Sequence, residues 1–83
     1  IAHKVTHWST DPYALGSYSY IPVGASAEDF GLLAEPVGER LLFAGEATSF
    51  DHYQTVHGAM FTGLREARRL GVTQTRVPGL EDW

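Results

Sequence analysis

The order in which an apolar run, a glycine and a long helical stripe follow one another constrains the fold of this chain most strongly. Residues 41–44 are continuously apolar and lie between Gly38 and Gly45. Such a run is typical of a strand that is buried on both faces, as in a parallel sheet covered by helices. Between Thr55 and Gly71 the apolar residues recur at helical spacing, which predicts one long amphipathic helix. Its apolar positions are Val56, Ala59, Met60, Gly63, Leu64, Ala67 and Leu70.

Strand, glycine-flanked loop and helix, in this order, make up half of a nucleotide-binding α/β unit. The other half would carry the fingerprint Gly-x-Gly-x-x-Gly, and this pattern does not occur in the 83 residues. The sequence therefore predicts part of an α/β fold and does not by itself identify a dinucleotide.

Two shorter elements are predicted in the first half of the chain. Residues 4–8 combine β-branched and aromatic side chains, which predicts a short strand, and Pro12 breaks it because proline lacks an amide donor. Residues 26–29, Ser-Ala-Glu-Asp, resemble a capping box. A helix of at most three turns should begin there and end by Glu35, before Pro36.

The chain is short and has no disulfide cross-link. A chain of this size buries roughly 60–65% of its unfolded surface. Cysteine does not occur in the sequence, which excludes a disulfide and a thiolate metal site. Hydrophobic residues make up 43% and charged residues 19%, a globular composition rather than a disordered one. We expect marginal stability for these residues alone.

Charge and hydropathy argue against two classes of partner. The net charge is −4, whereas a nucleic-acid surface needs clustered cations. The one basic cluster, Arg65, Arg68 and Arg69, falls in the last turns of the predicted helix, where we interpret it as stabilising the helix dipole. No apolar run approaches the ~20 residues of a membrane span. We predict no nucleic acid and no membrane as partner.

The start of the chain gives weaker indications. Ile1 opens a stretch that lacks the charged and apolar regions of a secretory signal, so a cytoplasmic location is expected. The sequence does not begin with methionine, which hints at a piece of a longer reading frame or a cleaved chain.

Two backbone features could bind a ligand. Ligands of open α/β sheets bind just beyond the carboxyl ends of strands, where Gly45 permits close approach and Glu46 can accept hydrogen bonds from sugar-type hydroxyls. The amides that open the long helix near Thr55 lack partners and lie at the positive end of its dipole, so they suit an anion. The same residues can also have a purely structural role, Gly45 and Glu46 as a plain turn and Thr55 as a helix cap.

Aromatic residues gather around Gly16 and Ser17, in an extended crossing expected over residues 13–23. They can stack on planar ligands or attract cationic amines, and they can equally be core residues. They are Trp8, Tyr13, Tyr18 and Tyr20.

Two other kinds of site are poorly supported. His3, His7, His52 and His57 are not arranged with carboxylates at a ligand spacing, so we predict no metal site. The serines of the aromatic region do not lie in a Gly-x-Ser-x-Gly motif, which disfavours a hydrolase nucleophile.

Together, four motifs spread over about residues 5–70 resemble the C-terminal end of the flavin amine oxidase superfamily. Its members include monoamine oxidases, polyamine oxidases and lysine-specific histone demethylases, and the last two branches are the nearest in pattern. The motifs are Trp8-x-x-Asp11-Pro12-x-x-x-Gly16-Ser17-Tyr18-Ser19-Tyr20, Phe43-Ala44-Gly45-Glu46-x-Thr48, Tyr53-x-Thr55-Val56-His57-Gly58-Ala59 and Gly63-x-Arg65-Glu66-Ala67.

The resemblance implies the architecture. It implies the C-terminal part of an FAD-binding, Rossmann-like, doubly wound α/β domain together with one strand of the substrate domain, which is not a complete fold by itself. Residues 1–10 would be the substrate-domain strand, residues 11–71 the segment that closes the FAD domain, and residues 72–83 a tail. The remainder of the oxidase, on the same or a separate chain, would be the partner.

The resemblance also implies which residues bind the cofactor. Glu46, after Gly45, would bind the ribityl or pyrophosphate part of FAD. The backbone of Thr55 and Val56 would meet the pyrimidine edge of the flavin, in agreement with the dipole argument.

The substrate side of the site follows from the same resemblance. Trp8, Tyr13 and Ser17 would pack along the flavin, and Tyr18 would form one wall of an aromatic cage for the amine. Monoamine oxidases attach FAD through a cysteine at the position of Ser17, so FAD should be non-covalent here. Their second cage aromatic matches Thr55, so the pocket should be wider and should favour polyamines or other bulky amines.

The implied reaction is oxidative deamination of a small-molecule amine, in which the imine hydrolyses and O2 yields hydrogen peroxide. The chemistry belongs to the flavin, and no catalytic residue is expected within this segment, which should be inactive alone. Two alternatives remain open, a segment of an L-amino-acid oxidase of the same superfamily and a non-catalytic remnant kept for packing or interaction.

Overall fold

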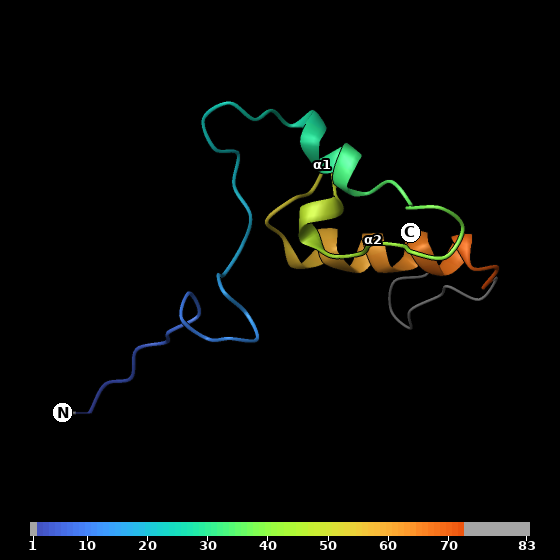
Figure 1. Ribbon diagram of the computed structural model, residues 1–83. Coiled ribbons are helices and arrows are strands. Elements are labelled where there is room, and N and C mark those ends of the chain that lie inside the picture. The colour runs from blue at the N-terminus through green and yellow to red at the C-terminus, as the bar shows by residue number, and fades with distance from the viewer. Residues whose placement is uncertain (1, 73–83) are drawn as a thin grey trace.

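The computed structural model describes residues 2–72 and contains two α-helices joined through one helical turn. Helix α1 spans Glu28–Leu33, the 3-10 helix η1 spans Glu46–Thr48, and α2 spans Val56–Arg69. Figure 1 shows η1 between the two α-helices and shows the chain before α1 as an extended arm that leads away from them. We call residues 2–27 the arm. The predicted tail, apart from Val72, lies outside the described residues.

The two predicted strands are wrong for this structure. Residues 4–8 form no strand, and residues 41–44 contribute only an isolated bridge between Leu41 and Val37. That bridge consists of two hydrogen bonds of 2.9 Å and 3.4 Å between amide nitrogen and carbonyl oxygen. A strand exists only where a neighbouring strand supplies hydrogen-bond partners, and residues 2–72 supply no such strand for these two stretches beyond the single bridge at Leu41. The α/β architecture is therefore not displayed by the described residues.

Helix α1 forms where the acidic pair predicted it. The Asp29 carboxylate accepts a 3.1 Å hydrogen bond from the Ser26 amide, which is one half of a capping box. The other half is not made, because the Asp29 amide donates to the backbone carbonyl oxygen of Ser26, at 3.1 Å, instead of to its hydroxyl. The helix buries Phe30, whose ring stacks on that of Tyr53 with centroids 4.4 Å apart.

Helix α2 has the predicted length and both predicted ends. Thr55 is extended and its side chain accepts a hydrogen bond from the Gly58 amide, so it is the N-cap. At the other end Gly71 has φ of 84°, a left-handed conformation that glycine adopts freely. The amides of Gly71 and Val72 bond to the carbonyl oxygens of Arg68 and Ala67, which is a Schellman motif.

The buried face of α2 differs from the face that its hydrophobic pattern predicts. Gly58, Thr62 and Glu66, each one turn from the next, are its buried residues. The predicted apolar stripe lies on another side of the helix, and Val56 and Leu70 at its ends are 89% and 72% exposed. The pattern predicted the helix correctly and its packing incorrectly.

The described residues contain a very small apolar core. Phe30 and Ala34 are the only buried hydrophobic side chains among them. The Cα radius of gyration is 15.6 Å, whereas a compact domain of this length has about 11–12 Å. The helices are therefore held together chiefly by the polar contacts around η1.

Candidate functional site

Residues 43–48 are fixed to α2 by a buried threonine. The Thr62 hydroxyl accepts a 2.8 Å hydrogen bond from the Gly45 amide and donates toward the carbonyl oxygens of Ala59, at 2.7 Å, and Gly45, at 3.2 Å. Thr62 is only 2% exposed. Gly45 has φ of 136°, which L side chains rarely adopt, so the turn requires glycine.

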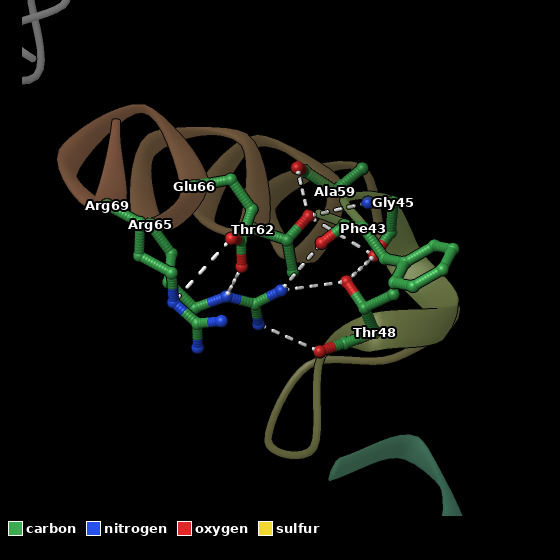
Figure 2. A network of polar contacts seen from close by, with 8 residues as sticks. All are labelled: Phe43, Gly45, Thr48, Ala59, Thr62, Arg65, Glu66 and Arg69. Atoms are coloured by element: carbon green, nitrogen blue, oxygen red, sulfur yellow. Dashed lines mark hydrogen bonds and ion pairs between the residues drawn. The ribbon is translucent and has the colours of Figure 1, made fainter. Parts of the chain in front are cut away.

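Arg65 attaches the same loop to the helix through its whole guanidinium group. Nη1 donates to the carbonyl oxygen of Thr48 at 2.9 Å, and Nη2 donates to the carbonyl oxygen of Phe43 at 3.1 Å and to the Thr48 hydroxyl at 3.2 Å. Nε donates to the Glu66 carboxylate. Figure 2 shows this network between α2 and the loop that carries η1. This network corrects our interpretation of Arg65 as a charge that only stabilises the helix dipole.

The buried carboxylate of Glu66 completes this network. Glu66 is 6% exposed, and Arg65 and Arg69 each approach one of its oxygens, Arg69 at 3.6 Å. The second contact is an ion pair without a hydrogen bond. A carboxylate this buried must be paired, because an isolated charge inside a protein is very costly.

Glu46 ties three segments together. Its Oε1 accepts from the Ser19 amide at 2.8 Å, and its Oε2 accepts from the Ser19 hydroxyl at 2.6 Å and from the Gln54 amide at 2.7 Å. The Gln54 side-chain amide donates back to the Ser19 carbonyl oxygen at 2.6 Å. Burial raises the pKa of Glu46, but these donors outweigh burial, so the pKa lies below its ordinary value of 4.5.

The first turn of α2 is tightly built and open to solvent. Thr55 Oγ1 accepts from the Gly58 amide at 2.9 Å and donates to the His52 carbonyl oxygen at 2.6 Å. Within residues 2–72 no hydrogen bond reaches the amides of Val56 and His57. Val56 and His57 are both exposed. Their unpaired amides, at the positive end of the α2 dipole, are therefore not buried in a core.

The structure brings most of the predicted site residues together. Gly45, Glu46, Thr55 and Val56 lie at the junction of η1 and α2. Ser17 and Tyr18 share with Glu46 a cavity of about 220 Å³, which Ala14 and Gly16 also line. Predicted cofactor and substrate residues from two distant stretches of sequence therefore meet at Glu46.

Trp8 and Tyr13 do not join this group. Tyr13 is fully exposed, and Trp8 is half-exposed beside a cavity formed by residues of the arm alone. Within the described residues neither aromatic ring has a ring contact or a hydrogen bond with Glu46 or α2. Their predicted role beside a flavin stays a prediction.

The sequence analysis did not predict four residues of the site, which are Ser19, Gln54, Thr62 and Arg65. The spacing of Gly58, Thr62 and Glu66, four residues apart, is the signal that could have indicated a small, polar buried face on α2. No comparable local signal marks Ser19 or Gln54, because their partners lie 8 to 35 residues away.

Neither a metal cluster nor a membrane-spanning helix occurs in the described part of the chain. Among residues 2–72 no three His, Cys, Asp or Glu side chains gather so that they could hold a metal ion. His52 and His57 have ring centroids 5.1 Å apart, without a third ligand in this range. Neither α-helix of these residues combines the length and the apolar character needed to cross a bilayer.

The comparison with known protein families decides the family. The family described as flavin containing amine oxidoreductase matches residues 1–71. The chain belongs to this family. The resemblance drawn from the four motifs is thereby confirmed.

Relatives within the family include histone demethylases and a polyamine oxidase. Lysine-specific histone demethylase 1 homolog 3 of Arabidopsis thaliana is 56% identical over 70 residues, which cover 84% of this chain and 4% of that protein. Homolog 2 from the same plant is 52% identical, covering 78% of this chain and 9% of that protein. Polyamine oxidase 1 of Oryza sativa subsp. japonica is 48% identical over 80 residues, covering 81% of this chain and 16% of that protein.

The chain thus spans 4% to 16% of the length of these three relatives. Family membership implies a flavin cofactor and the Rossmann-like domain that holds it. The names of the relatives include both demethylases and a polyamine oxidase, so they do not select one substrate class.

Proposed function

We propose that this chain supplies the C-terminal part of the flavin and substrate site of an amine oxidase, with FAD bound non-covalently. The observation that carries the proposal is the open first turn of α2, where the Val56 and His57 amides lack partners within the described residues. They lie beside Gly45 and Glu46, at the junction where α/β folds bind nucleotides.

The residues present fit the ring edge and the ribityl hydroxyls of a flavin. The unpaired amides and the helix dipole suit the electron-rich pyrimidine edge of the ring. Gly45 has open space where a Cβ would stand, which leaves room for close approach to its backbone. Glu46 Oε1 accepts a single hydrogen bond among the described residues and keeps capacity for a ribityl hydroxyl.

Two side chains support non-covalent attachment and a wide substrate pocket. Ser17 lines the cavity next to Glu46, and a serine hydroxyl cannot form the thioether that a cysteine forms with a flavin. Tyr18 lines the same cavity and would form one wall for the amine. By the resemblance, Thr55 would stand where monoamine oxidases have a second aromatic wall. A pocket with one aromatic wall favours polyamine-type or other bulky amines.

A bound flavin would supply the redox chemistry, with a hydride taken from the carbon next to the amine nitrogen, hydrolysis of the resulting imine and reduction of O2 to hydrogen peroxide. The role of this segment is to bind the flavin and to orient the amine, since no residue in it is assigned a proton transfer. Residues 1–10 belong to the substrate domain, residues 11–71 close the FAD domain, and the remainder of the oxidase is the partner that covers both.

A chimeric enzyme tests the proposal. In it residues 1–71 replace the matching segment of polyamine oxidase 1 from Oryza sativa, whose own sequence there is 48% identical. We expect a yellow protein that holds about one FAD, releases it on denaturation and forms peroxide from polyamines. A chimera that folds as judged by circular dichroism but holds no flavin would contradict the proposal, and flavin without peroxide from any amine would favour the non-catalytic alternative.

A further inference from the structure

Gln54 has an unusual backbone conformation next to the helix cap. Its φ is 67°, and only one other non-glycine residue in the described part of the chain, Leu15, has a positive φ. A left-handed conformation is unfavourable for an ordinary side chain and persists only where the surroundings enforce it. The residue immediately after Gln54 is the N-cap of α2.

Two hydrogen bonds enforce this conformation. The Gln54 amide donates to Glu46 Oε2 at 2.7 Å, and Gln54 Nε2 donates to the Ser19 carbonyl oxygen at 2.6 Å. Because Ser19 donates in turn to Glu46, three residues from the arm, η1 and the loop before α2 form a closed ring of hydrogen bonds. We call this ring the Ser19–Glu46–Gln54 clamp.

The clamp lies one residue away from each half of the proposed site. Tyr18, the proposed wall for the amine, precedes Ser19, and Thr55, the cap of the proposed flavin-facing amides, follows Gln54. The length of the Gln54 side chain therefore sets the separation between the segment of Tyr18 and the start of α2. Gln54 itself does not line the cavity that Ser17, Tyr18 and Glu46 share.

We infer that Gln54 is a positioning residue that holds Tyr18 in register with the first turn of α2 and so sets the affinity of the site for its amine. The inference rests on the proposed function and deepens it, since it assigns substrate placement to a residue that touches neither substrate nor flavin. Flavin binding depends on Glu46 and the helix amides, which remain when the Gln54 side chain is shortened.

The test uses the flavin-loaded chimera and two variants at Gln54. Gln54→Ala removes the side-chain bond, and Gln54→Glu keeps the shape but replaces the donor by an oxygen that repels the Ser19 carbonyl. We expect KM for the polyamine to rise roughly five- to tenfold in both, as for one lost hydrogen bond. The kcat and the FAD dissociation constant should stay within about twofold. Asp51→Ala, an exposed change in the same loop, is the control and should leave KM unchanged.

A double-mutant cycle separates positioning from general stability. If Gln54 acts through Tyr18, Gln54→Ala should add nothing to KM in a chimera that already carries Tyr18→Ala. Unchanged KM in both Gln54 variants would overturn the inference, as would additive effects in the cycle or a loss of FAD that parallels the rise in KM. A parent chimera without flavin would instead show that the proposed function itself is wrong.

Discussion

In this segment single polar side chains hold the loop against the helix, which is the role of apolar packing in most small folds. Thr62 and Arg65 each reach across to the loop that carries η1 and satisfy carbonyl or amide groups there. A hydroxyl and a guanidinium can do this because they present several hydrogen-bonding sites in a fixed geometry. The loop keeps its shape without a sheet to support it.

Replacing Arg65 by lysine should loosen this loop although the charge is kept. A lysine ammonium cannot present the planar fork that contacts Phe43, Thr48 and Glu66 together. We expect a loss of about 1–3 kcal/mol in local stability, measured as faster hydrogen exchange of the Gly45 amide in the chimera. Arg40→Lys, at an exposed position, should leave that rate unchanged, and equal rates in both variants would contradict the assigned role.

The Glu46 carboxylate should make the Ser19–Glu46–Gln54 clamp sensitive to acid. Because its pKa is depressed in the folded state, its contribution is full above the ordinary value of 4.5 and is lost as the pH falls through the lower folded pKa. We expect the amide resonances of Ser19 and Gln54 to shift together below pH 4.5. Glu46→Gln should abolish this shift, and a shift that persists in that variant would assign the titration to another group.

At the scale of elements, α2 depends on one glycine for its start. A Cβ on Gly58 would clash with the His52 carbonyl oxygen and would stand 2.8 Å from Thr55 Oγ1, so the cap could not close. Gly63 lies in the same helix, and apart from the nearby backbone of that helix no atom of residues 2–72 lies within 4 Å of the place that its Cβ would take, so alanine fits there. The two glycines serve different purposes, although both lie in family motifs.

Alanine at these two positions should have opposite effects. Gly58→Ala should destabilise the helix start by about 1–3 kcal/mol, as overpacking does, in spite of the better helix propensity of alanine. Gly63→Ala should stabilise α2 by about 0.5–1 kcal/mol. Helix content of the 83-residue chain, measured by circular dichroism, should fall in the first variant and rise in the second. The same sign in both would contradict the crowding at Gly58.

The elements show which parts of a fold a sequence determines locally. The ends of α2 were predictable because Thr55 and Gly71 act on amides and carbonyls within one turn. The strands at residues 4–8 and 41–44 were not, since a strand depends on a neighbour that the described residues do not provide. Glu46 and Thr55 were predicted for the site, whereas Arg65 was not, because its acceptors in the loop that carries η1 lie 17 to 22 residues away.

At the scale of the whole molecule, apolar surface is the most prominent feature. The arm exposes Trp8, Tyr13, Tyr18 and Tyr20, and the stripe of α2 is open at Val56 and Leu70. Exposed apolar patches of this kind mark surfaces that contact other protein. Within our proposal, the remainder of the oxidase covers them.

The 83-residue chain alone should therefore fail to hold a flavin. Titration of the chain with FAD should give no saturable complex at micromolar concentration, because it presents only one edge of the site. The chimera should bind FAD stoichiometrically under the same conditions. A tight complex with the isolated chain, seen as a shift in flavin absorbance or quenched flavin fluorescence, would contradict this division of the site.

The most direct test of the central claim is hydrogen exchange of the chimera with and without FAD. We predict that loading FAD slows exchange of the Val56 and His57 amides about tenfold or more, because these open donors then face the flavin. The Schellman amide of Gly71, at the far end of α2, should keep its rate. Unchanged exchange at Val56 and His57, with protection elsewhere in the chimera, would show that the start of α2 does not face the cofactor.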